Sequence, residues 1–122
     1  MRPMSTYPPV IPMLRVFPDG GARAFYVDYL GFQTDWEHHF EPELPLYQQV
    51  SRGPWVLHLS EHIGDATPGS AVRFITDDIA ALHSELRAKP RVPAVPKIER
   101  CDWGDELLVL DPFGNRLIFH QP

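Results

Sequence analysis

The chain of 122 residues has little of what several classes of protein require. Its only cysteine is Cys101, so an internal disulfide is excluded and nothing indicates an oxidising compartment. Lys and Arg number 11 against 16 Asp and Glu, and the net charge of -5 argues against a nucleic-acid partner, because phosphate binding requires a basic face. No apolar run approaches the length of a membrane span, and the first residues lack the apolar core of a signal peptide. We therefore expect a cytoplasmic protein with neither a membrane nor a nucleic-acid partner.

Proline, by contrast, is abundant. The 14 prolines gather in the first dozen residues and between Pro90 and Pro96, and such clusters are typical of extended arms and connectors. The length suits one domain with one core. The sequence therefore predicts an N-terminal arm over 1–10 and a single domain over 11–121.

The spacing of apolar residues predicts the same order of elements twice. The first set is a strand at 11–17, a helix at 21–30 capped by Asp19, and strands at 32–40, 46–51 and 55–60. The second set is a strand at 70–76, a helix at 79–88 capped by Asp77 or Asp78, and strands at 95–101, 106–110 and 116–120. The last two strands flank the turn Asp111–Asn115, whose Asx and Gly residues favour turn conformations.

This repetition predicts an α+β fold of two βαβββ modules, at about 11–60 and 69–121. Neither half could bury its own sheet alone. We therefore expect one curved mixed sheet, with the helices outside and a cleft inside.

Several motifs resemble the glyoxalase, bleomycin-resistance and extradiol-dioxygenase superfamily, also called the vicinal-oxygen-chelate fold. They are Ala22 with Ala24-Phe25-Tyr26 and Tyr29-Leu30-Gly31-Phe32, Leu57-His58-Leu59-Ser60-Glu61-His62 with Gly64-Asp65, Trp103-Gly104, and Asp111-Pro112-Phe113-Gly114-Asn115. The resemblance covers nearly the whole chain, and the run at 57–65 and Trp103-Gly104 look like the bleomycin-resistance branch. That branch implies a homodimer, with exchange of strands or of the N-terminal arm.

Enzymes of this superfamily hold a divalent metal with His and Glu side chains at three strand positions. Carried over by motif, these positions fall at Pro12, Ala71 and Ile118, none of which is a usual metal ligand. A register shifted by one residue gives Ile11 or Met13, Ser70, and Leu117 or Phe119, of which only Ser70 has a hard oxygen, a poor ligand on its own. The resemblance thus implies neither metal nor cofactor, no catalytic residue, and non-catalytic sequestration of a bleomycin-type antibiotic or similar bulky aromatic ligand. A metal-dependent lyase or isomerase of the glyoxalase type is the alternative, and a binding module for another metabolite is a third.

The candidate ligand-binding residues follow from strand alternation and side-chain chemistry. His58 lies opposite Leu57 and Leu59 in its strand and so faces the cleft if those two pack in the core. Aromatic side chains in a cleft suit flat heteroaromatic groups, and a cationic substituent adds cation–π attraction. The candidates are Trp36, His38, Tyr47, Gln49, His58, Arg73, Trp103, Arg116 and Ile118.

Each candidate also has a purely structural interpretation. The aromatic residues could pack in the core, and His58 could be a hydrogen-bonded histidine without a ligand. Arg73 and Arg116 inside a cleft would need a carboxylate, from Glu37 or Glu106, or a ligand anion. A metal site at Glu61, His62 and Asp65 is conceivable, but a solvated loop is the simpler interpretation. Cys101 lacks a neighbouring base and lies among acids that raise a thiol pKa, which argues against a nucleophile.

Overall fold

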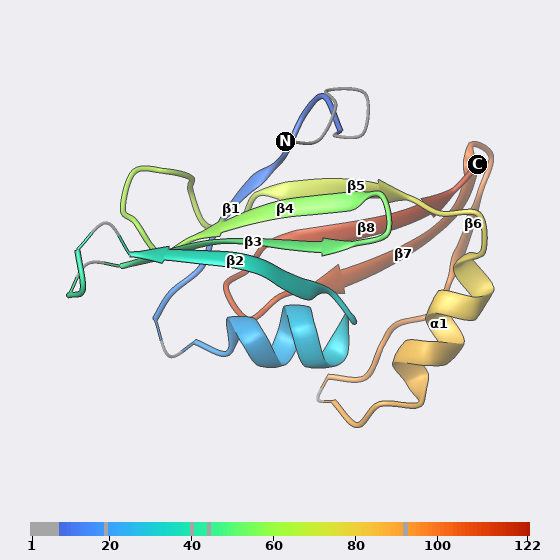
Figure 1. The fold of residues 1–122 in the computed structure, drawn as a ribbon. Coiled ribbons are helices and arrows are strands. Elements are labelled where there is room, and N and C mark those ends of the chain that lie inside the picture. Colours follow the sequence, from blue (N-terminus) through green and yellow to red (C-terminus); the bar gives the residue numbers. More distant parts are fainter. Residues whose placement is uncertain (1–7, 19, 40, 44, 92) are drawn as a thin grey trace. The chain divides into compact units, whose positions relative to one another are not determined.

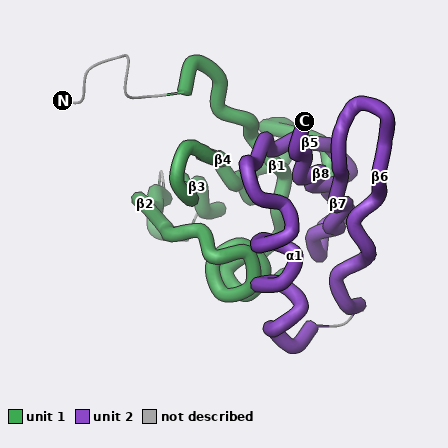
Figure 2. Tube along the Cα trace, turned by 90° about the vertical axis from the view of Figure 1, so that its right-hand side faces the viewer, with its two compact units in different colours: residues 1–68 green, residues 69–122 purple. Residues whose placement is uncertain are grey.

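A computed structural model describes residues 8–18, 20–39, 41–43, 45–91 and 93–122. The chain divides into two compact units, Met1–Pro68 and Gly69–Pro122 (Figure 2). Each unit has one four-stranded mixed sheet, and each contains one helix (Figure 1). The predicted α+β fold of two βαβββ modules is confirmed. The single sheet curved around a cleft concerns the arrangement of the two units and stays a prediction.

Unit one carries β1 (Met13–Arg15), the helix η2 (Arg23–Tyr29), β2 (Gln33–His39), β3 (Leu46–Arg52) and β4 (Trp55–Ser60). Its sheet, called sheet one below, has the order β1-β4-β3-β2. β1 runs parallel to β4, and the other neighbours are antiparallel.

Unit two carries β5 (Ala71–Ile75), α1 (Ile79–Arg87), β6 (Glu99–Cys101), β7 (Gly104–Leu110) and β8 (Arg116–Gln121). Its sheet, sheet two below, has the order β5-β8-β7-β6, with β5 parallel to β8. α1 buries Ile79, Leu82 and Leu86, the residues at helical spacing, and contacts β7 and β8. Asp78 caps it by accepting a hydrogen bond from the amide of Ala81 at 3.0 Å.

The first helix differs from the sequence prediction. It runs over Arg23–Tyr29 and is a π-helix, in which the amide of Leu30 reaches back five residues to the carbonyl of Phe25 at 2.9 Å. A π-helix has more residues per turn than an α-helix, so side chains of consecutive residues point in more similar directions. In agreement with this, the consecutive residues Phe25 and Tyr26 are both buried. The predicted cap Asp19 lies outside the described residues, and Ala22 at the N-cap position makes no side-chain bond.

Proline explains two strands that are shorter than predicted. β1 begins at Met13 rather than at residue 11, and Pro12 has no N–H for the ladder. β6 begins at Glu99 rather than at residue 95, just beyond Pro96. β7 starts two residues earlier than predicted, at Gly104, because Cys101 at the end of β6 already pairs with Gly104 and only a short turn joins the two strands. β1 also ends two residues earlier than predicted, at Arg15 rather than at residue 17. The remaining strand ends agree with the prediction within one residue, except that the predicted end at Phe40 lies outside the described part.

The turn between β7 and β8 is held by the side chain of Asp111. Its Oδ1 accepts the amides of Phe113 and Asn115, both at 2.8 Å, and its Oδ2 accepts the side-chain amide of Asn115 at 2.8 Å. The other end of that amide accepts the backbone N–H of Ser70 at 3.1 Å. The predicted Asx turn is thus confirmed, and it also fixes the start of β5 beside the start of β8.

In both sheets the core occupies one face. Leu14, Val50, Leu57 and Leu59 are buried on one face of sheet one, and Phe74, Leu107, Val109, Leu117 and Phe119 on one face of sheet two. Because side chains alternate along a strand, the opposite face of each sheet presents a different set of residues. No helix in the described part of the chain is long and apolar enough to span a membrane.

Candidate ligand-binding site

Five predicted binding residues lie together on the face of sheet one that turns away from its core. Trp36 of β2 is paired with Gln49 of β3, and Gln49 is paired with His58 of β4. His38 is paired with Tyr47 in the same way. Directly opposed residues share a face, so these side chains form one surface, called the aromatic–polar face below.

A chain of hydrogen bonds connects this surface. The hydroxyl of Tyr47 lies 2.7 Å from Nδ1 of His58, and Nε2 of His58 lies 3.0 Å from Oε1 of Gln49. The Gln49 amide in turn donates to Oδ2 of Asp35 at 3.0 Å. Gln33 and Ser51 donate to Oδ1 of Asp35 at 3.1 and 3.0 Å.

The carboxylate fixes the direction of every bond in this chain. A carboxylate only accepts, so Gln49 must turn its NH₂ group to Asp35 and its carbonyl oxygen to His58. Nε2 of His58 therefore carries the proton, and Nδ1 is left as the acceptor for the Tyr47 hydroxyl. The hydroxyl oxygen of Tyr47 consequently keeps its lone pairs free to accept a hydrogen bond from a donor outside this hydrogen-bond network, such as a ligand.

Burial favours the neutral forms on which this arrangement depends. It lowers the pKa of His58 below the ordinary value for histidine, which keeps the imidazole neutral near pH 7. It also raises the pKa of Tyr47, an effect that the nearby Asp65 carboxylate reinforces. The phenol therefore remains a phenol over the whole physiological range.

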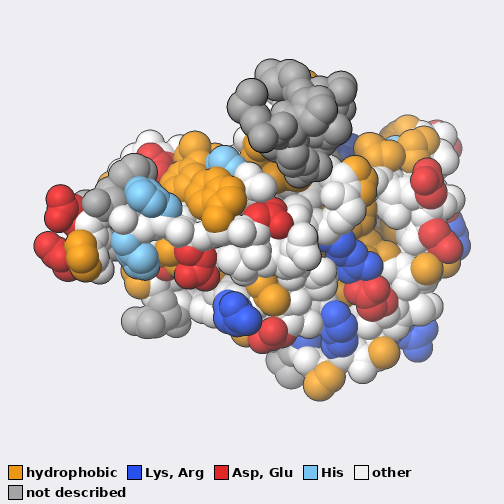
Figure 3. All heavy atoms as spheres, viewed as in Figure 1, with side chains coloured by type: hydrophobic (Ala, Val, Ile, Leu, Met, Phe, Trp, Pro, Cys, Tyr) orange, Lys and Arg blue, Asp and Glu red, His pale blue; other side chains and the backbone are white. Residues whose placement is uncertain are grey.

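The rings of this face form a compact group with one open member. Trp36 and Tyr47 are nearly parallel, 15° apart with centroids at 6.0 Å, and both meet His58 at steep angles. Trp36 keeps 42% of its surface exposed. Figure 3 shows histidine side chains next to exposed hydrophobic ones over the part of unit one where β2 and β3 lie. An exposed indole beside a hydrogen-bond acceptor suits a flat heteroaromatic ligand that carries N–H donors.

The other predicted residues lie in unit two. Arg73 of β5 and Ile118 of β8 are directly opposed and lie on the face of sheet two that turns away from its core. Arg116 is on that face too, but it is opposed to Ala71 and Leu110, and no acidic side chain among the described residues pairs with it. Being exposed, Arg116 needs no such partner, unlike the buried arginine that the sequence suggested.

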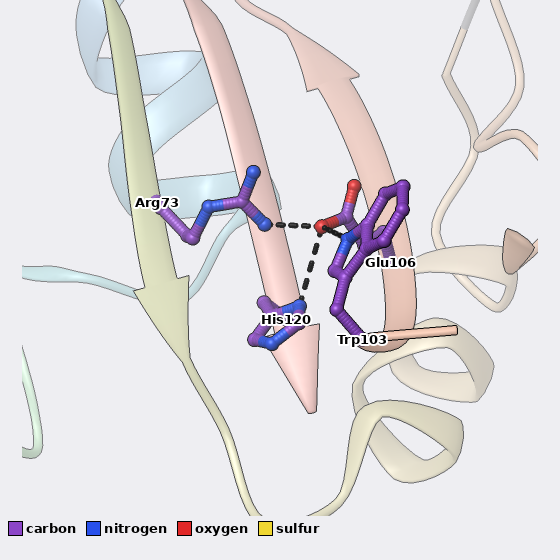
Figure 4. A network of polar contacts seen from close by, with 4 residues as sticks. All are labelled: Arg73, Trp103, Glu106 and His120. Carbon is purple, nitrogen blue, oxygen red and sulfur yellow. Dashed lines mark hydrogen bonds and ion pairs between the residues drawn. The ribbon is translucent and has the colours of Figure 1, made fainter. Parts of the chain in front are cut away.

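Glu106 of β7 is the centre of the polar group on sheet two (Figure 4). Its Oε2 pairs with the Arg73 guanidinium, accepts the indole N–H of Trp103 at 2.8 Å and lies 3.3 Å from Nδ1 of His120. The bonds from Arg73 and Trp103 hold the pKa of Glu106 below its usual range, against the opposing effect of burial. Of the two carboxylates expected for Arg73, Glu106 rather than Glu37 is therefore the partner.

Trp103 projects from the tight turn between β6 and β7, with 65% of its surface exposed. Gly104 follows it with φ 131°, and a Cβ there would lie 2.5 Å from the carbonyl oxygen of Gln121. Only glycine fits this close approach of two backbones. The Trp103-Gly104 pair thus places a large, exposed ring at one end of sheet two and holds it through Glu106.

Two members of these groups were not predicted. Asp35 was not predicted because strict alternation would place its side chain on the face opposite Trp36. The register shift between Thr34 and Trp36 instead brings both side chains to one face. A bulge of one residue leaves no clear signal in the sequence. His120 is not among the predicted binding residues, although its alternation with Ile118 indicates the same face of the strand.

No three His, Cys, Asp or Glu side chains in the described residues are grouped as metal ligands. In the loop at 61–65, Glu61 accepts the backbone N–H of Leu46 at 3.0 Å, and Asp65 accepts the hydroxyl of Ser60 at 2.6 Å. Both acids thus serve the local structure. Burial, followed by the nearby carboxylates of Glu106, Glu99 and others, raises the pKa of the Cys101 thiol, which opposes nucleophilic chemistry.

Comparisons with known proteins agree with this architecture. A family described as "Glyoxalase superfamily protein" matches residues 4–122. The structure of a bleomycin-binding protein complexed with bleomycin is similar with a TM-score of 0.71 and 20% identity, over 93% of this chain and 97% of that one. An antibiotic-binding protein from Streptomyces sp. CB03234 gives 0.72 and 24%, over 93% and 95%.

A bleomycin-binding protein from bleomycin-producing Streptomyces verticillus, in complex with copper(II)-bleomycin, gives a TM-score of 0.65 and 27% identity, over 93% of this chain and 94% of that one. No curated protein sequence matches the chain. At these identities the likeness establishes the fold, and the chemistry has to be argued from the side chains.

Proposed function

The chain belongs to the glyoxalase superfamily, and from this premise we propose that it binds and sequesters a bleomycin-type antibiotic, or a similar bulky aromatic ligand, without changing it covalently. Binding alone would protect a cell, because a sequestered antibiotic cannot reach its target.

The observation that carries this proposal is the aromatic–polar face of sheet one. Its exposed Trp36 offers a surface for stacking, and the Tyr47 oxygen accepts a hydrogen bond at its edge. Asp35 and Asp65 add negative charge nearby, which favours a ligand with a cationic substituent. Two of the similar structures hold bleomycin or copper(II)-bleomycin, and this supports the choice of ligand class.

Sequestration is preferred over a metal-dependent lyase because of three side chains. By the motif resemblance, the ligand positions of the superfamily's enzymes correspond to Pro12, Ala71 and Ile118, and none of these offers an oxygen or nitrogen donor from its side chain. The polar groups that the structure does bring together, around His58 and Glu106, are bonded to one another rather than arranged as open ligand sets.

Calorimetric titration with metal-free bleomycin tests the proposal. We expect saturable binding, and we expect mass spectrometry to recover the antibiotic with its mass unchanged. Absence of heat at high micromolar concentration, with folded protein, would remove bleomycin as the ligand. Stoichiometric Ni, Zn, Mn or Fe in the purified protein, together with turnover of a small substrate, would replace sequestration by lyase or isomerase chemistry.

We also propose that the active form is a homodimer, as the resemblance to the resistance branch implies. The face of sheet two supports this, because Ile75, Leu108 and Leu110 are exposed on it and a second chain would cover such apolar side chains. Light scattering after size-exclusion chromatography should give twice the chain mass of 14.0 kDa. The predicted exchange of the arm over 1–10 involves residues that lie mostly outside the described part.

A further inference from the structure

The hydrogen-bond chain of the aromatic–polar face contains one group of the kind that changes its charge near neutral pH, the imidazole of His58. While this imidazole is neutral, its Nε2–H donates to Oε1 of Gln49, and its Nδ1 accepts the hydroxyl of Tyr47. The Tyr47 hydrogen then points at His58, and only the Tyr47 oxygen is available to a ligand. In this state a hydrogen-bond acceptor lies beside the exposed ring of Trp36.

Protonation of His58 would reverse the role of the Tyr47 hydroxyl. An imidazolium donates from both nitrogens, so Nε2 keeps its bond to Gln49, while Nδ1 becomes a donor to the Tyr47 oxygen 2.7 Å away. The Tyr47 hydrogen then has to turn away from His58, toward the surface. Nothing else in the chain has to move, because the Asp35 carboxylate still fixes the orientation of the Gln49 amide.

Other charged groups lie near this face, but none of them replaces His58 in the chain. Within unit one they are Arg15 of β1, Asp35 and His38 of β2, Tyr47 of β3, and His62 and Asp65 of the loop after β4. Asp35 reaches His58 only through Gln49, and Arg15 is opposed to Ser60, two residues along β4. Among the residues that the structure describes, the titratable group bonded to the Tyr47 hydroxyl is therefore His58.

We propose that the aromatic–polar face has two ligand specificities, and that the proton on His58 selects between them. With neutral His58 the face binds aromatic cations that carry N–H donors, and with charged His58 it binds aromatic anions that accept hydrogen bonds. This inference rests on the proposed function, since it places the ligand on the same face.

Two effects of the proton act in the same direction. Tyr47 changes from an acceptor to a donor, and a positive charge appears next to Trp36, whose ring centroid lies 5.3 Å from that of His58. Burial holds the pKa of His58 below its ordinary value of about 6.5, so the neutral state prevails at pH 7.5 and the charged state forms on acidification. A cationic ligand bound at neutral pH would therefore be released in acid.

Two probes of the same shape test this proposal. 2-Naphthamidine is a flat cation with N–H donors, 2-naphthoate is a flat anion with acceptors only, and both stay charged between pH 7.5 and 5.0. NMR titration of the full chain, followed at the Trp36 indole N–H, gives the Kd of each. From pH 7.5 to 5.0 we expect the Kd of naphthamidine to rise about tenfold and that of naphthoate to fall about tenfold, because a hydrogen bond to a charged group is lost or gained.

The opposite signs of these two changes are the decisive result. Equal directions for both probes, constant Kd values, or no binding of naphthamidine at pH 7.5 would each overturn the proposal. The nitrogen chemical shifts of His58 in the wild type add a test without any substitution. They should show a proton on Nε2 alone at pH 7.5 and protons on both nitrogens at pH 5.0, and a proton on Nδ1 alone at pH 7.5 would overturn the proposal.

Variants assign the effect to one imidazole. His58→Gln has no group that gains a proton, so the Kd of each probe should vary less than about twofold over this pH range. His39→Gln removes a histidine whose side chain points to the other face of β2, and it is the matched control that should keep both tenfold changes. A pH dependence that persists in folded His58→Gln would assign it to another group, and the proposal would fail.

The bleomycin titration remains a separate test. Absence of bleomycin binding together with opposite pH dependences of the two probes would refute sequestration of that antibiotic and leave the two specificities in place. Binding of bleomycin together with parallel responses of the probes would refute the role of His58 alone.

Discussion

Replacing Trp36 by Ala should weaken antibiotic binding markedly while the protein stays folded. Trp36 is 42% exposed. Since a tryptophan buries about 150–250 Å² in full, roughly 60–100 Å² of its surface remains for a ligand to cover. At about 25 cal/mol per Å² this is worth about 1.5–2.5 kcal/mol, and stacking of two rings adds about 0.5–1.5 kcal/mol. The lower sum of about 2 kcal/mol corresponds to a roughly 30-fold increase in Kd.

Calorimetric titration of the wild type, Trp36→Ala and Trp36→Phe with bleomycin measures this difference. The Phe variant keeps a ring on the same strand position, so its Kd should stay within about threefold of the wild type, given the modest worth of one aromatic pair. Urea unfolding should show a loss of about 2–3.5 kcal/mol for the Ala variant, because the fold covers more than half of the indole, roughly 90–145 Å², at about 25 cal/mol per Å². A natively folded Ala variant with an unchanged Kd would refute the assignment of this face.

Three further results are expected, two from the hydrogen bonds of Tyr47 and His58 and one from the glycine that follows Trp103. Tyr47→Phe keeps the ring but removes the donor to His58, and urea unfolding should show a loss of about 1 kcal/mol; no loss would mean that the bond is absent in solution. Burial lowers the pKa of His58 in the folded protein, so on acidification the imidazole is protonated in the unfolded chain before it is protonated in the folded one. The stability that the neutral His58 contributes is therefore complete above its unfolded pKa of about 6.5. It falls as the pH drops toward the lower folded pKa. Between pH 7.5 and 5.0 the wild type should therefore lose more stability than His58→Gln, and equal losses would contradict the shift. Gly104→Ala should destabilise the fold by about 1–3 kcal/mol and change Trp103 fluorescence. Gly64→Ala, which shares a positive φ but meets no atoms within 4 Å, is its control, and equal costs would exclude the clash.

Much of the fold could be predicted because its signals are local. The Asp111–Asn115 turn is formed by hydrogen bonds within five residues, and Asp78 caps its helix from three residues away. The alternation of Leu57, His58 and Leu59 was enough to place His58 on the face away from the core. Such features depend on neighbouring residues, so a sequence pattern contains them.

What the sequence could not predict depends on contacts between distant residues or on small changes of register. The π-helix over Arg23–Tyr29 differs from an α-helix by one residue in its hydrogen bonding, and the same apolar spacing suits both. The choice of Glu106 over Glu37 as partner of Arg73 required the register of β5, β8 and β7, which brings Arg73 beside Ile118 and Glu106 beside His120. A list of charged residues does not contain that register.

Asp35 shows how one irregularity in register determines the chemistry of a surface. In a regular β2, alternation would group Asp35 with Glu37, on the core side of the sheet. The bulge instead brings Asp35 to the aromatic–polar face, where its carboxylate fixes the orientation of Gln49 and hence the tautomer of His58. That tautomer turns the Tyr47 proton inward and leaves the Tyr47 oxygen as the acceptor at the edge of the face. The preference for a ligand with N–H donors therefore originates in a backbone feature one strand away from the atom that would bind it.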